Sequence, residues 1–116
     1  MVVEEGRSMQ KWILQGKSSK TIPTIHIVSD SVGTTAQAVA RAAAACFEVF
    51  DPAMEILPHC NSPKELISEI DSHVSLHRRI GEAPFILFYT LVAPDTREAL
   101  LGYIEKNSDI IVAVDA

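Results

Sequence analysis

The stretch IHIVSDSVGTT, residues 25–35, passes from an apolar run through a polar loop into the start of a helical pattern. Residues 25–28 are rich in β-branched side chains, which favours a strand buried within a sheet. Residues 34–50 repeat apolar side chains at helical spacing, on a face made of Ala36, Val39, Ala40, Ala43 and Phe47. A strand, a short loop and an amphipathic helix in this order are typical of a βαβ unit.

Short apolar runs continue to alternate with helical segments along the rest of the chain. Asp51-Pro52 should end the first helix, and Ser62-Pro63 supplies an N-cap and a first-turn proline for a second helix that reaches about Ile80. The inner face of that second helix is predicted to hold Leu66, Ile70 and Val74. Further strands are predicted at 55–57, 85–89 and 110–114, and a third helix begins at Pro94-Asp95.

This alternation predicts an α/β fold. We expect a three-layer Rossmann-like or flavodoxin-like domain with a mostly parallel sheet of about four strands, truncated after the fourth strand. Such a truncation would expose apolar surface, which leaves pairing with another chain, including a homodimer, open.

The length of 116 residues and a hydrophobic content of 47% are expected to give one compact domain. Residues 1–22 are predicted to form a flexible N-terminal extension, with a docking segment or a transit peptide as alternatives, and residues 23–116 to form the α/β domain. No apolar run reaches the roughly 20 residues needed to cross a bilayer. A cytoplasmic protein without membrane contact is expected, or an organellar one if the extension is a targeting remnant.

The formal charge of −5 argues against broad binding of nucleic acid, which requires clustered Lys and Arg. A small molecule or a protein is the expected partner. Cys46 and Cys60 show no metal-ligand spacing, so both are expected to be reduced and structural, and no metal site is predicted. His73 and His77 lie at i and i+4 without a nearby third ligand, and with His26 they are interpreted as structural or exposed.

The loop after the first strand is the candidate ligand site. In an open parallel sheet, ligands bind outside the carboxyl ends of the strands, and backbone amides at the start of the next helix would face a bound anion. Phosphate is therefore the expected ligand of a loop that contains Ser29, Ser31, Gly33, Thr34 and Thr35. The alternative is that these hydroxyls only cap the helix.

Asp30 is the candidate catalytic residue, because a carboxylate beside a phosphate site would bind a metal, accept a proton or orient a hydroxyl. Three further polar side chains are expected at the same edge of the sheet: His59, Thr90 and Arg97. Arg97 could clamp a phosphate with two hydrogen bonds, or pair with a neighbouring acid such as Asp95. His59 fits a capping or packing role better than a catalytic one.

Taken together, these segments resemble a known family. Residues 27–36, IVSDSVGTTA, with VARA at 39–42 and YTLV at 89–92, resemble the bifunctional kinase/phosphorylase that regulates pyruvate, phosphate dikinase and phosphoenolpyruvate synthase. Asp95 and Arg97 match an acid and an arginine that follow the YTLV segment in that family. Val32 stands where the family often has threonine, so the loop lacks one hydroxyl.

The resemblance implies a serine/threonine protein kinase that uses ADP to phosphorylate a threonine of the dikinase or the synthase. It also implies a phosphorylase that uses orthophosphate to release that group as pyrophosphate. The family's nucleotide-binding P-loop lies in the second half of much longer proteins, and residues 16–18, GKS, lack the upstream glycine and strand of a P-loop. The resemblance therefore implies an N-terminal half that handles phosphate or the target protein and lacks kinase activity by itself.

Two other functions stay open on the residues alone. A flavodoxin-like or receiver-like module would bind a phosphorylated small molecule without catalysis. A protein-interaction domain would recognise the dikinase, with residues 31–35 serving only as a helix cap.

Overall fold

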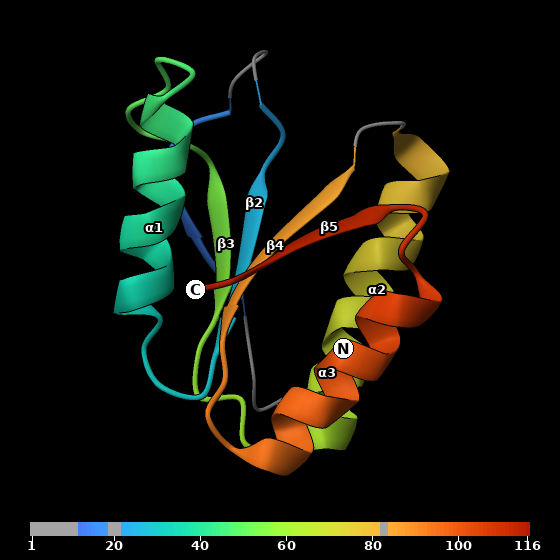
Figure 1. The fold of residues 1–116 in the computed structure, drawn as a ribbon. Coiled ribbons are helices and arrows are strands. Elements are labelled where there is room, and N and C mark those ends of the chain that lie inside the picture. Colours follow the sequence, from blue (N-terminus) through green and yellow to red (C-terminus); the bar gives the residue numbers. More distant parts are fainter. Residues whose placement is uncertain (1–11, 19–21, 82–83) are drawn as a thin grey trace, which may run out of the picture.

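The computed structural model describes residues 12–18, 22–81 and 84–116, in which strands and helices alternate along the chain (Figure 1). The strands are β1 (Ile13–Gln15), β2 (Ile25–Ser29), β3 (Met54–Leu57), β4 (Phe85–Thr90) and β5 (Ile111–Asp115). The helices are α1 (Thr34–Ala45), α2 (Pro63–Ile80) and α3 (Pro94–Lys106).

The strands form one sheet in the order β1-β3-β2-β4-β5. β2 lies at its centre and pairs in parallel with both neighbours, so that Ile27 stands opposite Ile56 of β3 and Phe88 of β4. β5 continues the parallel sheet from β4, and β1 pairs antiparallel with β3 at the other edge. The predicted α/β fold with a mostly parallel sheet is confirmed, and the sheet contains one strand more than the sequence indicated.

That additional strand is β1, which lies within the segment predicted to be a flexible extension. Its residues are exposed, and Ile13 pairs with Ile56 of β3. Trp12, directly before β1, packs against the core and donates a hydrogen bond from Nε1 to Glu69 Oε1 at 3.2 Å. A three-residue strand is too short to show a pattern of its own, and it forms because β3 offers an unpaired edge. Residues 1–11 and 19–21 of the predicted extension lie outside the described residues.

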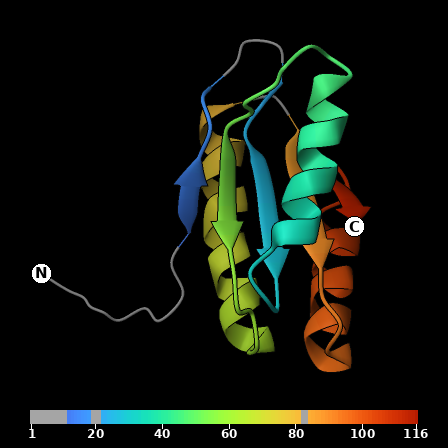
Figure 2. The ribbon, with the colours of Figure 1, turned by 90° about the vertical axis from the view of Figure 1, so that its left-hand side faces the viewer.

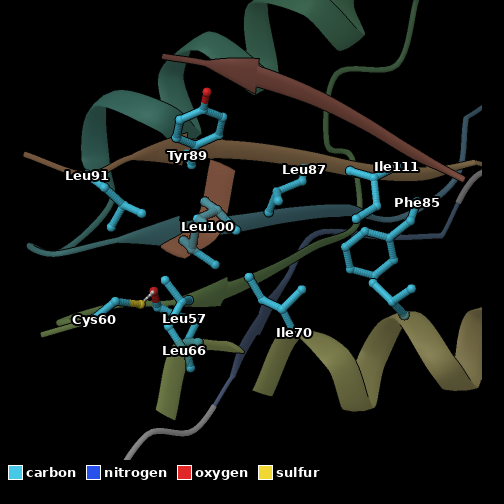
Figure 3. Close-up of a cluster of buried hydrophobic side chains, with 12 residues drawn as sticks. Leu57, Cys60, Leu66, Ile70, Phe85, Leu87, Tyr89, Leu91, Leu100 and Ile111 are labelled. Atoms are coloured by element: carbon cyan, nitrogen blue, oxygen red, sulfur yellow. Dashed lines mark hydrogen bonds between the residues drawn. The ribbon is translucent and has the colours of Figure 1, made fainter. Parts of the chain in front are cut away.

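The helices divide between the two faces of the sheet, which confirms the three-layer arrangement. α1 lies on one face, and α2 and α3 pack together on the other (Figure 1, Figure 2). The core on the α2 and α3 side includes Leu66, Ile70, Leu87 and Leu100, which are drawn in Figure 3. The core on the α1 side is smaller and includes Ile27, Ala36, Ala40, Ile56 and Phe88.

α1 ends at Ala45, before the predicted end at Asp51-Pro52. The amide of Glu48 donates to the Ala45 carbonyl and that of Val49 to the Ala44 carbonyl, while Glu48 has a φ of 63°. These two bonds around a left-handed residue form a Schellman turn, which closes the helix before proline is reached. As a result Ala36, Ala40 and Ala44 are the buried face, and Phe47, predicted to be buried, is 63% exposed.

α2 begins and ends as the sequence predicts. Ser62 Oγ accepts a hydrogen bond from the Glu65 amide at 3.3 Å, and Leu66, Ile70 and Val74 are buried.

Within the described ranges, no helix has both the length and the apolar character needed to cross a membrane.

Candidate functional site

The connections from the central strand change face between β2 and β4. The chain leaves β2 for β3 through α1 on one face, and it reaches β4 through α2 on the other. The loops that follow β2 and β4 therefore part at the carboxyl ends of these strands, which is where doubly wound sheets bind ligands. A surface cavity of about 390 Å³ lies there, lined by residues 29–35, 90–92 and 115–116.

The amino end of α1 forms one wall of this cavity. Gly33 is the N-cap, with a φ of 84°, and as a glycine it has no side chain that could cap the helix. The cap position itself therefore carries no hydroxyl. Thr34 and Thr35 follow Gly33 along the wall. First-turn N–H groups without helical partners, together with the positive end of the helix dipole, suit an anion.

Hydrogen bonds to the β3–α2 loop hold residues 29–31 in place. The Ser29 carbonyl accepts from the Cys60 amide, and the Ser31 carbonyl accepts from the His59 amide, both at 2.8 Å. Ser29 is buried, and its Oγ accepts from the Ser31 amide at 3.0 Å. The Ser29 hydroxyl thus shapes the loop. His59, which is exposed and has a φ of 58°, contacts the loop through its backbone and does not line the cavity.

Asp30 joins the two loops that border the cavity. Its Oδ2 accepts hydrogen bonds from the amides of Val92 at 2.7 Å and Ala93 at 3.1 Å. Its own amide donates to the Thr90 carbonyl at 3.3 Å. The carboxylate therefore sets the distance between the loops after β2 and β4, and two N–H donors offset its charge.

Arg97 pairs with Asp115 of β5 and not with Asp95, the acid considered above. Its guanidinium donates to both oxygens of Asp115, and Nη1 also lies 3.4 Å from the Leu91 carbonyl. Its carbon lies 5.6 Å from the centroid of the Tyr89 ring. The hydrogen bond lowers the pKa of Asp115 and raises the pKa of Arg97. Of the two roles considered for Arg97, the structure contains the ion pair.

The structure brings together most of the residues that the sequence singled out. Those that line the cavity are Ser29, Asp30, Ser31, Gly33, Thr34, Thr35 and Thr90. His59 and Arg97 are not in its lining, and Arg97 contacts the lining residues Leu91 and Asp115. Asp115 was missed as a site residue, although a carboxylate at the carboxyl end of a predicted strand was a usable signal.

The described residues were also compared with the ligand groups that hold metal ions. Among residues 12–18, 22–81 and 84–116, no group of three or more His, Cys, Asp or Glu side chains is arranged to hold a metal ion. Cys46 is an exposed thiol and Cys60 a buried one, and burial raises the pKa of Cys60 to about 11.

Comparison with known proteins finds a family model described as kinase/pyrophosphorylase, which matches residues 25–115. A protein of Carboxydothermus hydrogenoformans, named as a pyruvate, phosphate dikinase regulatory protein, is 33% identical over 87 residues, covering 75% of this chain and 27% of the relative. A protein of the same name from Caulobacter vibrioides is 33% identical over 97 residues, covering 78% of this chain and 29% of the relative.

A third relative, from Syntrophomonas wolfei, is named as pyruvate, phosphate dikinase regulatory protein 2. It is 31% identical over 96 residues, covering 83% of this chain and 33% of the relative. The chain thus spans a third or less of the length of these curated relatives. No solved structure gives a significant match.

Proposed function

The chain belongs to the kinase/pyrophosphorylase family, and we propose that it is the N-terminal domain of an enzyme that reversibly phosphorylates pyruvate, phosphate dikinase or phosphoenolpyruvate synthase. In this proposal the whole enzyme transfers a phosphoryl group from ADP to a threonine of its target. It removes that group with orthophosphate, which leaves as pyrophosphate. The names of the relatives support the target, since they are regulatory proteins of the dikinase.

The observation that carries the role of this domain is the cavity at the carboxyl ends of β2 and β4. Its wall combines the amino end of α1, where the N-cap residue is a glycine, with the hydroxyls of Ser31, Thr34 and Thr35. Backbone amides and hydroxyls are the usual ligands of a phosphate group when no lysine or arginine is adjacent. We propose that the cavity binds orthophosphate or the phosphoryl group of the modified threonine.

Asp30 keeps its place as the proposed catalytic carboxylate. Its two backbone hydrogen bonds fix one carboxylate oxygen between the loops, and the residue lines the cavity. In this role it would orient or deprotonate the attacking hydroxyl beside the phosphate. The Arg97–Asp115 pair would act indirectly, because it holds β5 against the loop between β4 and α3.

A phosphate titration followed by amide NMR tests this proposal. The amides of residues 31–35 are expected to shift saturably with phosphate and not with chloride at the same ionic strength. ADP is expected to leave them unchanged, because the sequence contains no glycine-rich P-loop.

Variants define the site in the same experiment. Replacing Ser31 or Thr34 with Ala should weaken phosphate binding about fivefold each, since a neutral hydrogen bond contributes about 1 kcal/mol. Ser68→Ala, an exposed change on α2 away from the cavity, is the matched control. If the amide chemical shifts of residues 31–35 did not change at tens of millimolar phosphate, the proposed role of the cavity would be contradicted.

A further inference from the structure

Two carboxylates line the cavity at the carboxyl ends of β2 and β4. They belong to Asp30 and Asp115, and the other described residues of the lining are serine, threonine, glycine or apolar residues, without lysine, arginine or histidine. An anion in this cavity therefore meets negative groups as well as the donors of α1, and like charges close together repel each other. Which anion the cavity accepts depends on the hydrogen bonds that these two carboxylates can still make.

The carboxylate of Asp115 is already engaged on both oxygens. Its Oδ1 lies 3.4 Å from Nη1 of Arg97, and its Oδ2 accepts a hydrogen bond from Nη2 of the same residue. The guanidinium charge lies directly beside the carboxylate and offsets much of its charge. A ligand in the cavity therefore meets Asp115 as one half of an ion pair.

Asp30, in contrast, has one oxygen engaged and one open. Oδ2 accepts the hydrogen bonds from the amides of Val92 and Ala93, and no donor among residues 12–18, 22–81 and 84–116 bonds to Oδ1. In the same described ranges, the side-chain atom that is enclosed without a partner is Nδ1 of His26, so Oδ1 of Asp30 is open to solvent. Because Asp30 lines the cavity, Oδ1 is the oxygen that a ligand there can reach.

Backbone bonds hold the carboxylate of Asp30 in one orientation. The amides of Val92 and Ala93 fix Oδ2, and the amide of Asp30 itself donates to the Thr90 carbonyl at 3.3 Å. Both the main chain and the side chain of Asp30 are thus tied to the loop after β4, and Oδ1 keeps its direction before a ligand binds. An ionised carboxylate oxygen only accepts hydrogen bonds, so its ligand must supply the proton.

An acceptor of this kind in an anion site favours an anion that carries a proton. Orthophosphate keeps an O–H group throughout the neutral pH range, whereas sulfate has none. The phosphoryl group of phosphothreonine loses its second proton with a pKa of about 6, so at pH 8 it also lacks an O–H group. Each of the three groups then has about two negative charges, but only orthophosphate can donate a hydrogen bond to Oδ1.

We propose that Oδ1 of Asp30 accepts a hydrogen bond from the O–H group of orthophosphate, and that Asp30 thereby selects orthophosphate over anions without a proton. This inference rests on the proposed function, because it concerns the same cavity. It decides between the two ligands named there. The cavity holds the orthophosphate that removes the phosphoryl group, and not the phosphoryl group of the modified threonine.

Amide NMR at pH 8 with four anions at constant ionic strength tests the selection. Orthophosphate and arsenate, which both keep an O–H group, are expected to shift the amides of residues 31–35 saturably. Sulfate and N-acetyl-phosphothreonine amide should bind at least about tenfold more weakly, which corresponds to about 1.4 kcal/mol.

The possible failures of this experiment are distinguishable. If sulfate or the phosphothreonine compound bound as tightly as orthophosphate, the selection by Asp30 would be overturned, while the cavity would remain an anion site. If none of the four anions gave a saturable shift, the proposed function of the cavity would be overturned together with the selection.

Two variants separate the hydrogen bond from the charge. In Asp30→Asn the amide oxygen can accept from Val92 and Ala93, which leaves an N–H donor in place of Oδ1. The preference for orthophosphate over sulfate should then fall at least about tenfold. Asp115→Asn is the matched control, since it removes the same charge from the same lining. It should strengthen the binding of both anions by a similar factor and keep their ratio.

An equal loss of this preference in both variants would assign it to charge alone and would overturn the role of Oδ1. The anion series on the unchanged chain needs no variant, so it decides the selectivity even if Asp30→Asn does not fold.

Discussion

Because His26 is buried, the stability of the whole domain should depend on pH. Its pKa falls from 6.5 to about 3, chiefly through desolvation and next through His73. The folded ring therefore stays neutral in a range where the same ring in the unfolded chain takes up a proton. Glu55, His73 and His77 are the other titratable groups that line, with His26, a cavity at the starting ends of β2 and β3.

The domain should lose stability as the pH falls from about 6.5 towards about 3. The unfolded state binds one more proton than the folded state in this window, which corresponds to a slope on the order of 1 kcal/mol per pH unit. Urea unfolding at pH 7 and pH 5 measures it. His26→Phe should flatten the dependence, whereas Ser75→Ala, an exposed change on α2, should preserve it. An equally steep slope in His26→Phe would assign the effect to other groups.

At the scale of elements, the junction between β2 and α1 depends on backbone conformation. Gly33 has a φ of 84°, which L side chains rarely adopt. A Cβ added there would meet only ordinary contacts, the nearest being Ile56 Cγ2 at 3.4 Å. Glycine is therefore required at this position because of its positive φ, and not because a side chain would lack space.

Gly33→Ala is expected to destabilise the domain by about 1–2 kcal/mol, because it places an alanine in the left-handed region. Gly102→Ala is the matched control, since Gly102 lies within α3 and an added Cβ meets nothing within 4 Å. That change should stabilise by about 0.5–1 kcal/mol. Denaturant midpoints of both variants give the comparison. Equal shifts of the same sign would contradict the conformational explanation.

At the scale of the whole molecule, one sheet separates two cores that share its strands. Trp12, the single tryptophan, packs on the α2 side, while Ile27 belongs to the α1 side. α1 covers only part of its face, and an apolar hollow beside it is bordered by Phe47 and Val112. Both cores rest on β2 and β4, so neither should unfold without the other.

Unfolding should therefore be one cooperative transition. Ile27→Val on the α1 side should cost about 0.5–1.5 kcal/mol and Leu100→Ala on the α2 side about 2–5 kcal/mol. For each variant, the denaturant midpoint followed by Trp12 fluorescence should shift by the same amount as the midpoint followed by far-UV circular dichroism. If a variant on the α1 side shifted the circular dichroism midpoint but not the Trp12 fluorescence midpoint, the two faces would unfold separately.

Local pattern determined much of this protein. Apolar periodicity and turn residues were enough for the order of β2 to β5 with their helices, for the mostly parallel sheet, and for the polar loop at the carboxyl end of β2. The resemblance to the family likewise rested on short contiguous stretches, the SDSVGTT loop and the YTLV segment. Such features depend on a few neighbouring residues, and they can be recognised without knowing the fold.

Only the tertiary structure decided which distant groups meet. Asp30 and its donor Val92 are 62 residues apart, and Arg97 and Asp115 are 18 apart. β1 exists because β3 has a free edge, and the His26 ring stacks on Phe85, which is 59 residues away in the sequence. Periodicity assigns a side chain to a face of its own element, whereas its partners depend on which strands and helices become neighbours in the folded sheet.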